Sequence, residues 1–245
     1  MSFGSPSIAL GYARARPPVH SRVLELVWGR TTFGHALDVG CGSGVSTTAL
    51  AGFATRRTGV EPVEAMCRLA PSVAPAAQFC VGTAENLPFG DRKFNCITAA
   101  GSLNYADIDR FFPEAARVLA PGGQILIYDF TPGRNFDTGA ELLSAWFDSF
   151  IARFPDPVGD AQELNPAILA TRSRARFRML RSLEFAVPVE MTETSYLEYA
   201  LTETNVAGRD EARDWCSETL RPVWEGREAV PVVFRGYAAL LSLPG

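Results

Sequence analysis

The stretch Leu37–Gly44, which reads LDVGCGSG, is the strongest local signal in the sequence. Its three glycines stand between an apolar run that ends at Val39 and a segment with helical character that begins at Val45. Glycines let the backbone turn tightly and approach a ligand closely, and the free N–H groups that open a helix attract a carboxylate or a phosphate. A dinucleotide-binding loop of the form G-x-G-x-x-G requires glycine where Val45 stands. The loop therefore indicates a ligand site at a strand-to-helix turn but departs from the dinucleotide spacing.

Short apolar runs alternate with helical stretches from this loop to Phe130. Strands are predicted at residues 35–40, 57–61, 78–82, 94–99 and 124–130, and helices at residues 45–53, 63–69 and 108–119. Strands connected through helices imply right-handed crossovers and a parallel sheet that is covered on both faces. Ligands of such sheets bind beyond the carboxyl ends of the strands, which is where the glycine loop stands.

The alternation ends after Phe130. Further helices are predicted at residues 138–154, 166–173, 194–204 and 210–220, and further strands at residues 183–189, 230–234 and 237–243, the last two separated by a break at Gly236. We expect residues 131–179 and 192–207 to be inserted elements that cover an acceptor site. The whole chain, residues 1–245, is then a single domain.

The composition disfavours several classes of protein. A hydrophobic share of 47% and a charged share of 20% are typical of a folded globular chain. The formal net charge of −4 offers no basic field for a polyphosphate, so we expect no nucleic-acid partner. No apolar run approaches the roughly 18 residues of a membrane span, and residues 1–16 carry no secretory signal.

The cysteine and lysine usage points to a cell compartment and a source. The five cysteines are odd in number and lack metal-ligand spacing, so we expect reduced thiols in the cytoplasm and no metal site. Lys93 is the only lysine among 23 basic residues. We interpret this excess of arginine as the codon bias of a GC-rich bacterial genome; the alternative is that some arginines bind carboxylates or phosphates.

Glu61 ends the second predicted strand, 23 residues beyond Asp38. A carboxylate at this place can accept hydrogen bonds from both hydroxyls of a ribose. The same arrangement serves nicotinamide and adenosyl ligands, so Glu61 indicates a nucleoside without choosing between them. A carboxylate that caps the next helix is the structural alternative.

Five segments follow one another in a fixed order along the chain. The first is LDVGCGSG itself. The others are GVEP at 59–62, GTAENLPF at 82–89, FNCI at 94–97 together with LNY at 103–105, and RVLAPGG at 117–123. In this order they resemble the motifs of the class I S-adenosylmethionine-dependent methyltransferases, and in particular the small-molecule branch of the ubiquinone-biosynthesis and trans-aconitate enzymes. Five matches in the right order are far more specific than any one of them.

The resemblance implies a fold, a cofactor and a set of residues that bind it. The fold is Rossmann-like and doubly wound, with a mostly parallel seven-stranded sheet, an antiparallel last strand and a helical cover insertion. The cofactor is S-adenosylmethionine, the product S-adenosylhomocysteine, and residues 1–30 cover the cofactor. The implied cofactor-binding residues are Arg14, Asp38, Gly40, Cys41, Gly42, Glu61, Pro62, Met66, Thr83, Ala84, Glu85, Ala99 and Ala100.

Two positions depart from the family pattern. Thr83 stands where the family usually has an aspartate that binds the adenine amino group, which weakens this contact. The pair Asn104-Tyr105 replaces a common His-Trp pair, so a histidine base is absent there. Tyr12, His20 and Tyr105 remain candidates for orienting or deprotonating the acceptor, which leaves the use of a general base open.

The expected reaction is methyl transfer to a small, apolar or aromatic metabolite, with the acceptor atom (O, N or C) and the oligomeric state open. Trp146 and Phe147 lie on an apolar helical stripe that either lines the acceptor site or packs in a core. An S-adenosylmethionine-binding protein that transfers no methyl group is the alternative function. A nicotinamide-dependent oxidoreductase is disfavoured because of the spacing at Val45.

Overall fold

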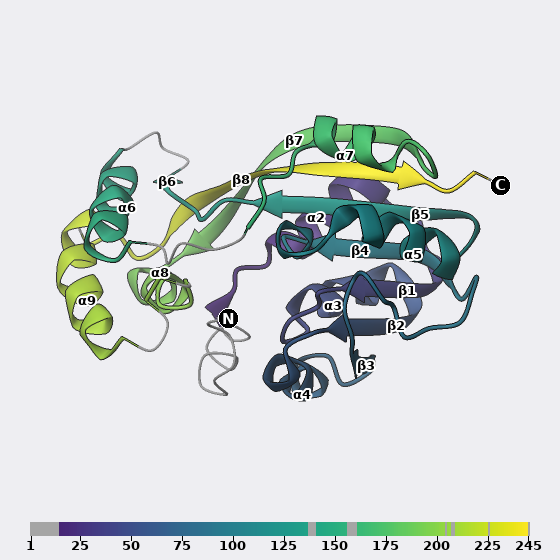
Figure 1. Cartoon of the computed structure of the whole chain (residues 1–245). Coiled ribbons are helices and arrows are strands. Elements are labelled where there is room, and N and C mark those ends of the chain that lie inside the picture. Colours follow the sequence, from purple (N-terminus) through teal and green to yellow (C-terminus); the bar gives the residue numbers. More distant parts are fainter. Residues whose placement is uncertain are drawn as a thin grey trace.

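A mixed eight-stranded sheet forms the centre of the protein, with the strand order β3-β2-β1-β4-β5-β8-β6 and with β7 on the other edge of β8 (Figure 1). The computed structural model describes residues 15–136, 141–155, 161–203, 205–206, 209–224 and 226–244. The parallel strands are β1 (Phe33–Val39), β2 (Ala54–Glu61), β3 (Gln78–Val81), β4 (Phe94–Ala100) and β5 (Leu119–Phe130). The antiparallel part comprises β6 (Asn135–Phe136), β7 (Arg178–Met191) and β8 (Val230–Ser242). The predicted fold class is therefore confirmed, with β6 as an additional two-residue strand.

Helices cover both faces of this sheet, because the central strands direct apolar side chains alternately to its two sides. On one face lie α2 (Val19–Trp28), α3 (Val45–Ala49) and the short helix η2 (Leu50–Gly52). This face buries Leu126 and Tyr128 of β5. On the other face lie α5 (Ile108–Val118) and α7 (Pro166–Ser173), over Ile125 and Ile127. The remaining helix of this half, α4 (Glu64–Val73), contacts α3, β2 and β3.

A group of helices lies beyond the carboxyl ends of the parallel strands, around the far half of the β7–β8 ladder (Figure 1). This cover consists of α6 (Leu142–Arg153), α8 (Glu193–Ala200) and α9 (Asp210–Trp224). Its interior is aromatic and continues the core of the α2 face; it includes Phe136, Trp146, Phe147, Phe150, Phe154, Tyr196, Tyr199, Trp224 and Phe234. Of the segment 131–179, α6 joins the cover, whereas α7 packs against α5, β7 and β8.

Gly236 does not break the last strand, contrary to the prediction. The strand β8 runs without interruption from Val230 to Ser242 and pairs with Phe130 through Gly236. A Cβ atom at this position would lie 2.0 Å from the carbonyl oxygen of Asp129. The glycine therefore lets β8 approach β5 closely.

The glycine-containing segment before the predicted fifth strand is a bulge inside β5. Phe94 pairs with Leu119 and Cys96 with Gln124, so the residues from 120 to 123 bulge out of the ladder. Gly122 adopts a φ of 72° there, in the left-handed region that glycine tolerates.

The carboxylate of Asp38 ties three segments together at the carboxyl end of β1. The side chain is fully buried, and its Oδ2 accepts hydrogen bonds from the hydroxyls of Ser46 at 2.6 Å and Thr47 at 2.7 Å. Its Oδ1 accepts from the hydroxyl of Thr98 at 2.9 Å. Burial raises the pKa of Asp38, and the three hydroxyls oppose this shift because they stabilise the charged form. The strand β1, the helix α3 and the strand β4 are thereby held in one arrangement.

Asp38→Asn should lower the free energy of unfolding by about 1.5–3 kcal/mol, the usual contribution of one hydrogen bond to a charged group. The amide places an N–H group where a hydroxyl now donates, and it carries no charge for the others to stabilise. Urea unfolding measures the effect. Asp91→Asn is the control, because the side chain of Asp91 is 73% exposed and its ion pair with Arg117 lies at the surface. Equal stability of the two variants would contradict the role of Asp38.

Candidate functional site

The glycine loop between β1 and α3 combines two closely packed positions with one open position. Gly40, Gly42 and Gly44 have φ values of 66°, 54° and 91°. A Cβ atom at Gly40 would lie 2.2 Å from the Cβ of Ser102, and one at Gly44 would lie 3.1 Å from the carbonyl oxygen of Ala70. A Cβ atom at Gly42 would meet no described atom within 4 Å. Packing therefore requires the outer glycines, whereas Gly42 exposes its backbone to open space at the carboxyl end of β1.

Glu61 lies next to this opening and holds the loop. Its Oε2 accepts a hydrogen bond from the backbone N–H of Gly42 at 2.9 Å, and its Oε1 accepts from the N–H of Val63 at 2.9 Å. The residue is 7% exposed, and burial raises the pKa of its carboxyl, while the two N–H groups oppose the shift. Each carboxylate oxygen can accept a second hydrogen bond. The carboxylate can therefore fix the loop and still bind two hydroxyls of a ligand.

Other predicted cofactor residues surround Glu61. Cys41 is 3% exposed, and its backbone N–H donates to the carbonyl of Val60. Cys41 therefore contributes to the loop through its backbone. Pro62 is exposed, and Met66 is 3% exposed on α4. Asp38 differs from this group because its buried carboxylate is occupied by three hydroxyls. It acts on the site indirectly, by positioning the loop.

The turn after β3 lies beside the carboxyl end of β2. Gly82 donates its N–H to the carbonyl of Glu61 at 3.2 Å, and Thr83 pairs with Asn86 in a single bridge. Thr83 is exposed and Ala84 is half-buried. Glu85 accepts a hydrogen bond from the backbone N–H of Asp107 at 2.8 Å, which ties the turn to the start of α5. Thr83 and Ala84 thus lie in the turn beside the end of β2, which carries Glu61.

The carboxyl end of β4 carries Ala99 and Ala100, the remaining predicted cofactor-binding residues. Ala99 is fully buried and Ala100 half-buried. The hydroxyl of Ser102 donates to the carbonyl of Val39 at 2.6 Å, so the end of β4 is tied to the end of β1. Tyr105, in the short helix η3 (Leu103–Tyr105), is 68% exposed.

Asp129, near the end of β5, is a carboxylate at the ligand-binding end of the sheet that the sequence analysis did not single out. Its Oδ2 accepts a hydrogen bond from Nδ2 of Asn104 at 2.7 Å. The signal was present in the sequence, since Asp129 is a carboxylate that ends an apolar strand on the side of the sheet where ligands bind.

The N-terminal candidates are only partly within the described residues. Tyr12 and Arg14 lie outside them. His20, on α2, is 8% exposed, and its Nδ1 lies 2.9 Å from the hydroxyl of Tyr128. Burial, and to a lesser extent the charge of Arg16, lower the pKa of His20 to about 4. The imidazole is therefore neutral at pH 7 and a weak proton acceptor.

Trp146 and Phe147 lie in the core of the cover. Trp146 is 5% exposed and its Nε1 donates to the hydroxyl of Thr219 at 2.9 Å. Phe147 is 1% exposed and lies under the guanidinium of Arg134, 4.3 Å from its Cζ. This placement corresponds to the core-packing alternative, so we do not assign these side chains to the acceptor wall.

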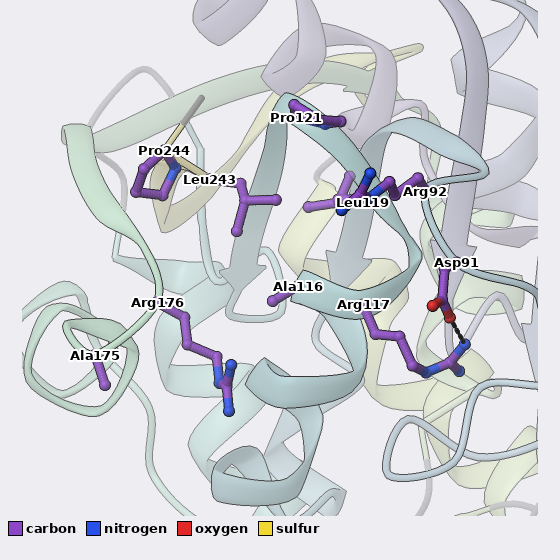
Figure 2. A pocket seen from close by; sticks show the side chains of 10 residues that line it. All are labelled: Asp91, Arg92, Ala116, Arg117, Leu119, Pro121, Ala175, Arg176, Leu243 and Pro244. Carbon is purple, nitrogen blue, oxygen red and sulfur yellow. Dashed lines mark hydrogen bonds and ion pairs between the residues drawn. The ribbon is translucent and has the colours of Figure 1, made fainter.

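A cavity of about 530 Å³ lies at the opposite end of the sheet, where β4 and β5 begin (Figure 2). It is lined by Asp91, Arg92, Ala116, Arg117, Leu119, Pro121, Ala175, Arg176, Leu243 and Pro244. The guanidinium of Arg117 is occupied, because it donates to the carbonyls of Leu87 and Phe89 and to two carboxylates, those of Asp91 and Glu114. This cavity is remote from the glycine loop, and Arg117 there stabilises the fold.

Known proteins share sequence or structure with parts of this chain. Residues 37–127 match the family described as "Methyltransferase domain". An uncharacterized methyltransferase of Mycobacterium tuberculosis is 31% identical over 164 residues, which are 65% of this chain and 63% of the relative. A demethylmenaquinone methyltransferase of Tropheryma whipplei is 34% identical over 111 residues, which are 44% of this chain and 46% of the relative. A solved structure from Anaeromyxobacter dehalogenans, provisionally assigned as a type II methyltransferase, is 25% identical, with a TM-score of 0.64 over 94% of this chain and 99% of that chain.

Residues 37–127 form a class I methyltransferase domain. This domain carries the glycine loop, Glu61 and the end of β4. The chain spans less than two thirds of the length of the curated relatives described above. Within the described residues, no helix is long and apolar enough to cross a membrane, and no group of three or more potential ligands is arranged to hold a metal ion.

The residues of the methyltransferase domain fit S-adenosylmethionine. The open position at Gly42 admits a ligand against the loop backbone, and Glu61 offers free acceptor capacity for ribose hydroxyls at 7% exposure. The exposed turn at Thr83 follows β3, which pairs with the strand that ends in Glu61, β2.

Glu61→Ala should weaken the binding of S-adenosylhomocysteine by about 1.5–3 kcal/mol, because hydrogen bonds to the charged carboxylate are lost and the loop loses its anchor. Titration calorimetry of the full chain measures this change. Glu64→Ala is the matched control, since the side chain of Glu64 is 64% exposed one turn further along the chain. Unchanged affinity in Glu61→Ala would refute the ribose assignment.

Gly42→Val should abolish this binding while the protein stays folded, because a Cβ atom at this position meets no described atom within 4 Å and the valine methyl groups fill the open space. Gly122→Val is the control for backbone strain: Gly122 has a φ of 72°, a Cβ atom there also meets nothing within 4 Å, and it lies at the other end of the sheet. Circular dichroism and calorimetry compare the two variants. Wild-type affinity in Gly42→Val would show that the loop does not cradle the ligand.

Proposed function

We propose that this chain transfers a methyl group from S-adenosylmethionine to a small, apolar or aromatic metabolite. The observation that carries the proposal is the pairing of the open Gly42 position with the carboxylate of Glu61, 2.9 Å from the N–H of Gly42. This arrangement suits the methionine and ribose parts of one ligand. S-adenosylmethionine, when bound, supplies an electrophilic methyl group on a sulfonium.

The residues of the chain bind and orient the cofactor and shield it from water. Glu61 accepts from the ribose hydroxyls, and Gly40 and Gly42 let the loop backbone approach the methionine part. The adenine is framed by Met66, Thr83, Ala84 and Glu85. The backbone carbonyls of Ala99 and Ala100 accept hydrogen bonds from the amino group of the cofactor's methionine part. Arg14 and residues 1–30 cover the cofactor. Positioning and exclusion of water supply much of the acceleration of a methyl transfer, because charge disperses in its transition state.

The acceptor is proposed to bind between the ends of β4 and β5 and the cover. The aromatic cover, formed by parts of residues 131–179 and 192–207, excludes water from this region. The demethylmenaquinone methyltransferase relative supports an aromatic acceptor. The net charge of −4 supports a small molecule over a nucleic acid. All five cysteines are free thiols, which supports a reducing, cytoplasmic compartment.

The test incubates the full chain with S-adenosylmethionine and a panel of quinols, phenols and amines, and measures S-adenosylhomocysteine by mass spectrometry. We expect acceptor-dependent formation of S-adenosylhomocysteine that Gly42→Val abolishes and Gly122→Val retains. Formation that is equal in Gly42→Val would contradict the proposal.

Measurements on the same purified protein distinguish two other functions. A chain that binds S-adenosylmethionine but forms no S-adenosylhomocysteine with any acceptor is a binding protein or a different enzyme. A nicotinamide cofactor found by mass spectrometry of the purified protein would indicate an oxidoreductase, although Val45 opposes this assignment.

A further inference from the structure

Asp129 places a carboxylate at the carboxyl end of β5, next to the end of β4. It shares a face of the sheet with Ile125 and Ile127, at the point where this face leaves the core. A Cβ atom at Gly101, which has a φ of 64°, would lie 2.9 Å from its Oδ1. Gly101 directly follows Ala100, whose backbone we assign to the cofactor. The carboxylate of Asp129 therefore lies at the end of the sheet where the methyl group would be transferred.

The carboxylate has unused capacity to accept hydrogen bonds. Its Oδ2 accepts from Asn104 at 2.7 Å and its Oδ1 from the backbone N–H of Phe130 at 2.8 Å. A carboxylate offers about four acceptor positions, so about two remain. No lysine, arginine or histidine forms an ion pair with it in the described part of the chain. Burial raises the pKa of Asp129, and the donors Asn104 and Phe130 oppose the shift.

Asn104 is itself held in place by the chain that follows β5. Its carbonyl accepts from the backbone N–H of Gln162 at 2.8 Å. The amide Nε2 of Gln162 donates to the carbonyls of Leu103 at 3.0 Å and Ala106 at 2.5 Å. Three hydrogen bonds from Gln162 thus hold the segment of η3, which carries Asn104 and the exposed Tyr105. Asp129 is oriented by a fixed donor, which is the arrangement that a general base requires.

We infer that Asp129 is the general base that takes the proton from a hydroxyl or protonated-amine acceptor, an assignment that rests on the proposed function. The acceptor oxygen or nitrogen forms a bond to the methyl carbon, the bond from this carbon to the sulfonium breaks, and its electron pair stays on sulfur. The proton of the acceptor passes to the Asp129 carboxylate, which later releases it to water. His20 serves this role less well, since it is 8% exposed and burial lowers its pKa to about 4.

The first test needs no acceptor. Carbon-13 NMR follows the carboxyl of Asp129 through a pH titration of the full chain in two complexes, one with S-adenosylhomocysteine and one with sinefungin, which carries a cationic amine in place of the transferable methyl. We expect the titration midpoint to be lower with sinefungin by about half a unit or more, because a nearby positive charge favours the ionised carboxylate.

The resonance is assigned by its loss in Asp129→Asn or, if that variant does not fold, by its shift in Asn104→Ser. Tyr237 on β8 is the titrating group that interacts with Asp129, and burial raises its pKa far above that of the carboxyl. It therefore does not titrate in the same range. Binding of neither ligand would overturn the proposed function. Binding of both with identical midpoints would overturn only the role of Asp129.

The second test is kinetic and uses a phenol or amine that the acceptor panel identifies. Asp129→Asn should lower kcat by about 100-fold while the KM for S-adenosylmethionine stays the same. The wild-type rate should fall as the pH decreases through the raised pKa of Asp129, and this limb should disappear in the variant. Asp91→Asn, at the opposite end of the sheet, should behave as wild type (Figure 2). A wild-type kcat, or an unchanged acidic limb, in Asp129→Asn would overturn the assignment.

Discussion

The buried carboxylate of Asp38 is the constraint on which the site depends. It accepts hydrogen bonds from one hydroxyl on β4 and from two at the start of α3. A buried charge is costly unless it is satisfied in this way, so the arrangement of the three elements is specified as a unit. The glycine loop spans the gap between the end of β1 and α3. Its path is therefore fixed before any ligand binds.

Glu61 completes the loop from the neighbouring strand, and the cover completes the site from the other side. The hydrogen bond that Glu61 accepts from the N–H of Gly42 joins the ends of β1 and β2. The ion pair between Arg16 and Glu203, at 3.3 Å, joins the segment before α2 to the cover. The continuous core that reaches from α2 into the aromatic cover gives this connection rigidity. The ends of β4 and β5, with Asp129, lie between these two supports.

Local patterns in the sequence predicted the parallel half of the sheet, the loop and Glu61, because strand periodicity and glycine spacing are local signals. Contacts between distant residues carry no such signal. The hydrogen bond from Asn104 to Asp129 joins residues that are 25 apart, and the approach of β8 to Asp129 made Gly236 a packing residue rather than a break. The stripe at Trp146 illustrates the same limit, since a core helix and a pocket wall have the same periodicity.

A crystal structure of the full chain with S-adenosylhomocysteine would show directly whether Glu61 and the glycine loop hold the ligand. We expect both ribose hydroxyls within hydrogen-bonding distance of Glu61, the ligand against the open face of Gly42, and the sulfur directed toward the ends of β4 and β5. A ligand bound elsewhere, such as in the cavity beside Arg117 and Arg176, or a ribose that does not contact Glu61, would contradict this assignment.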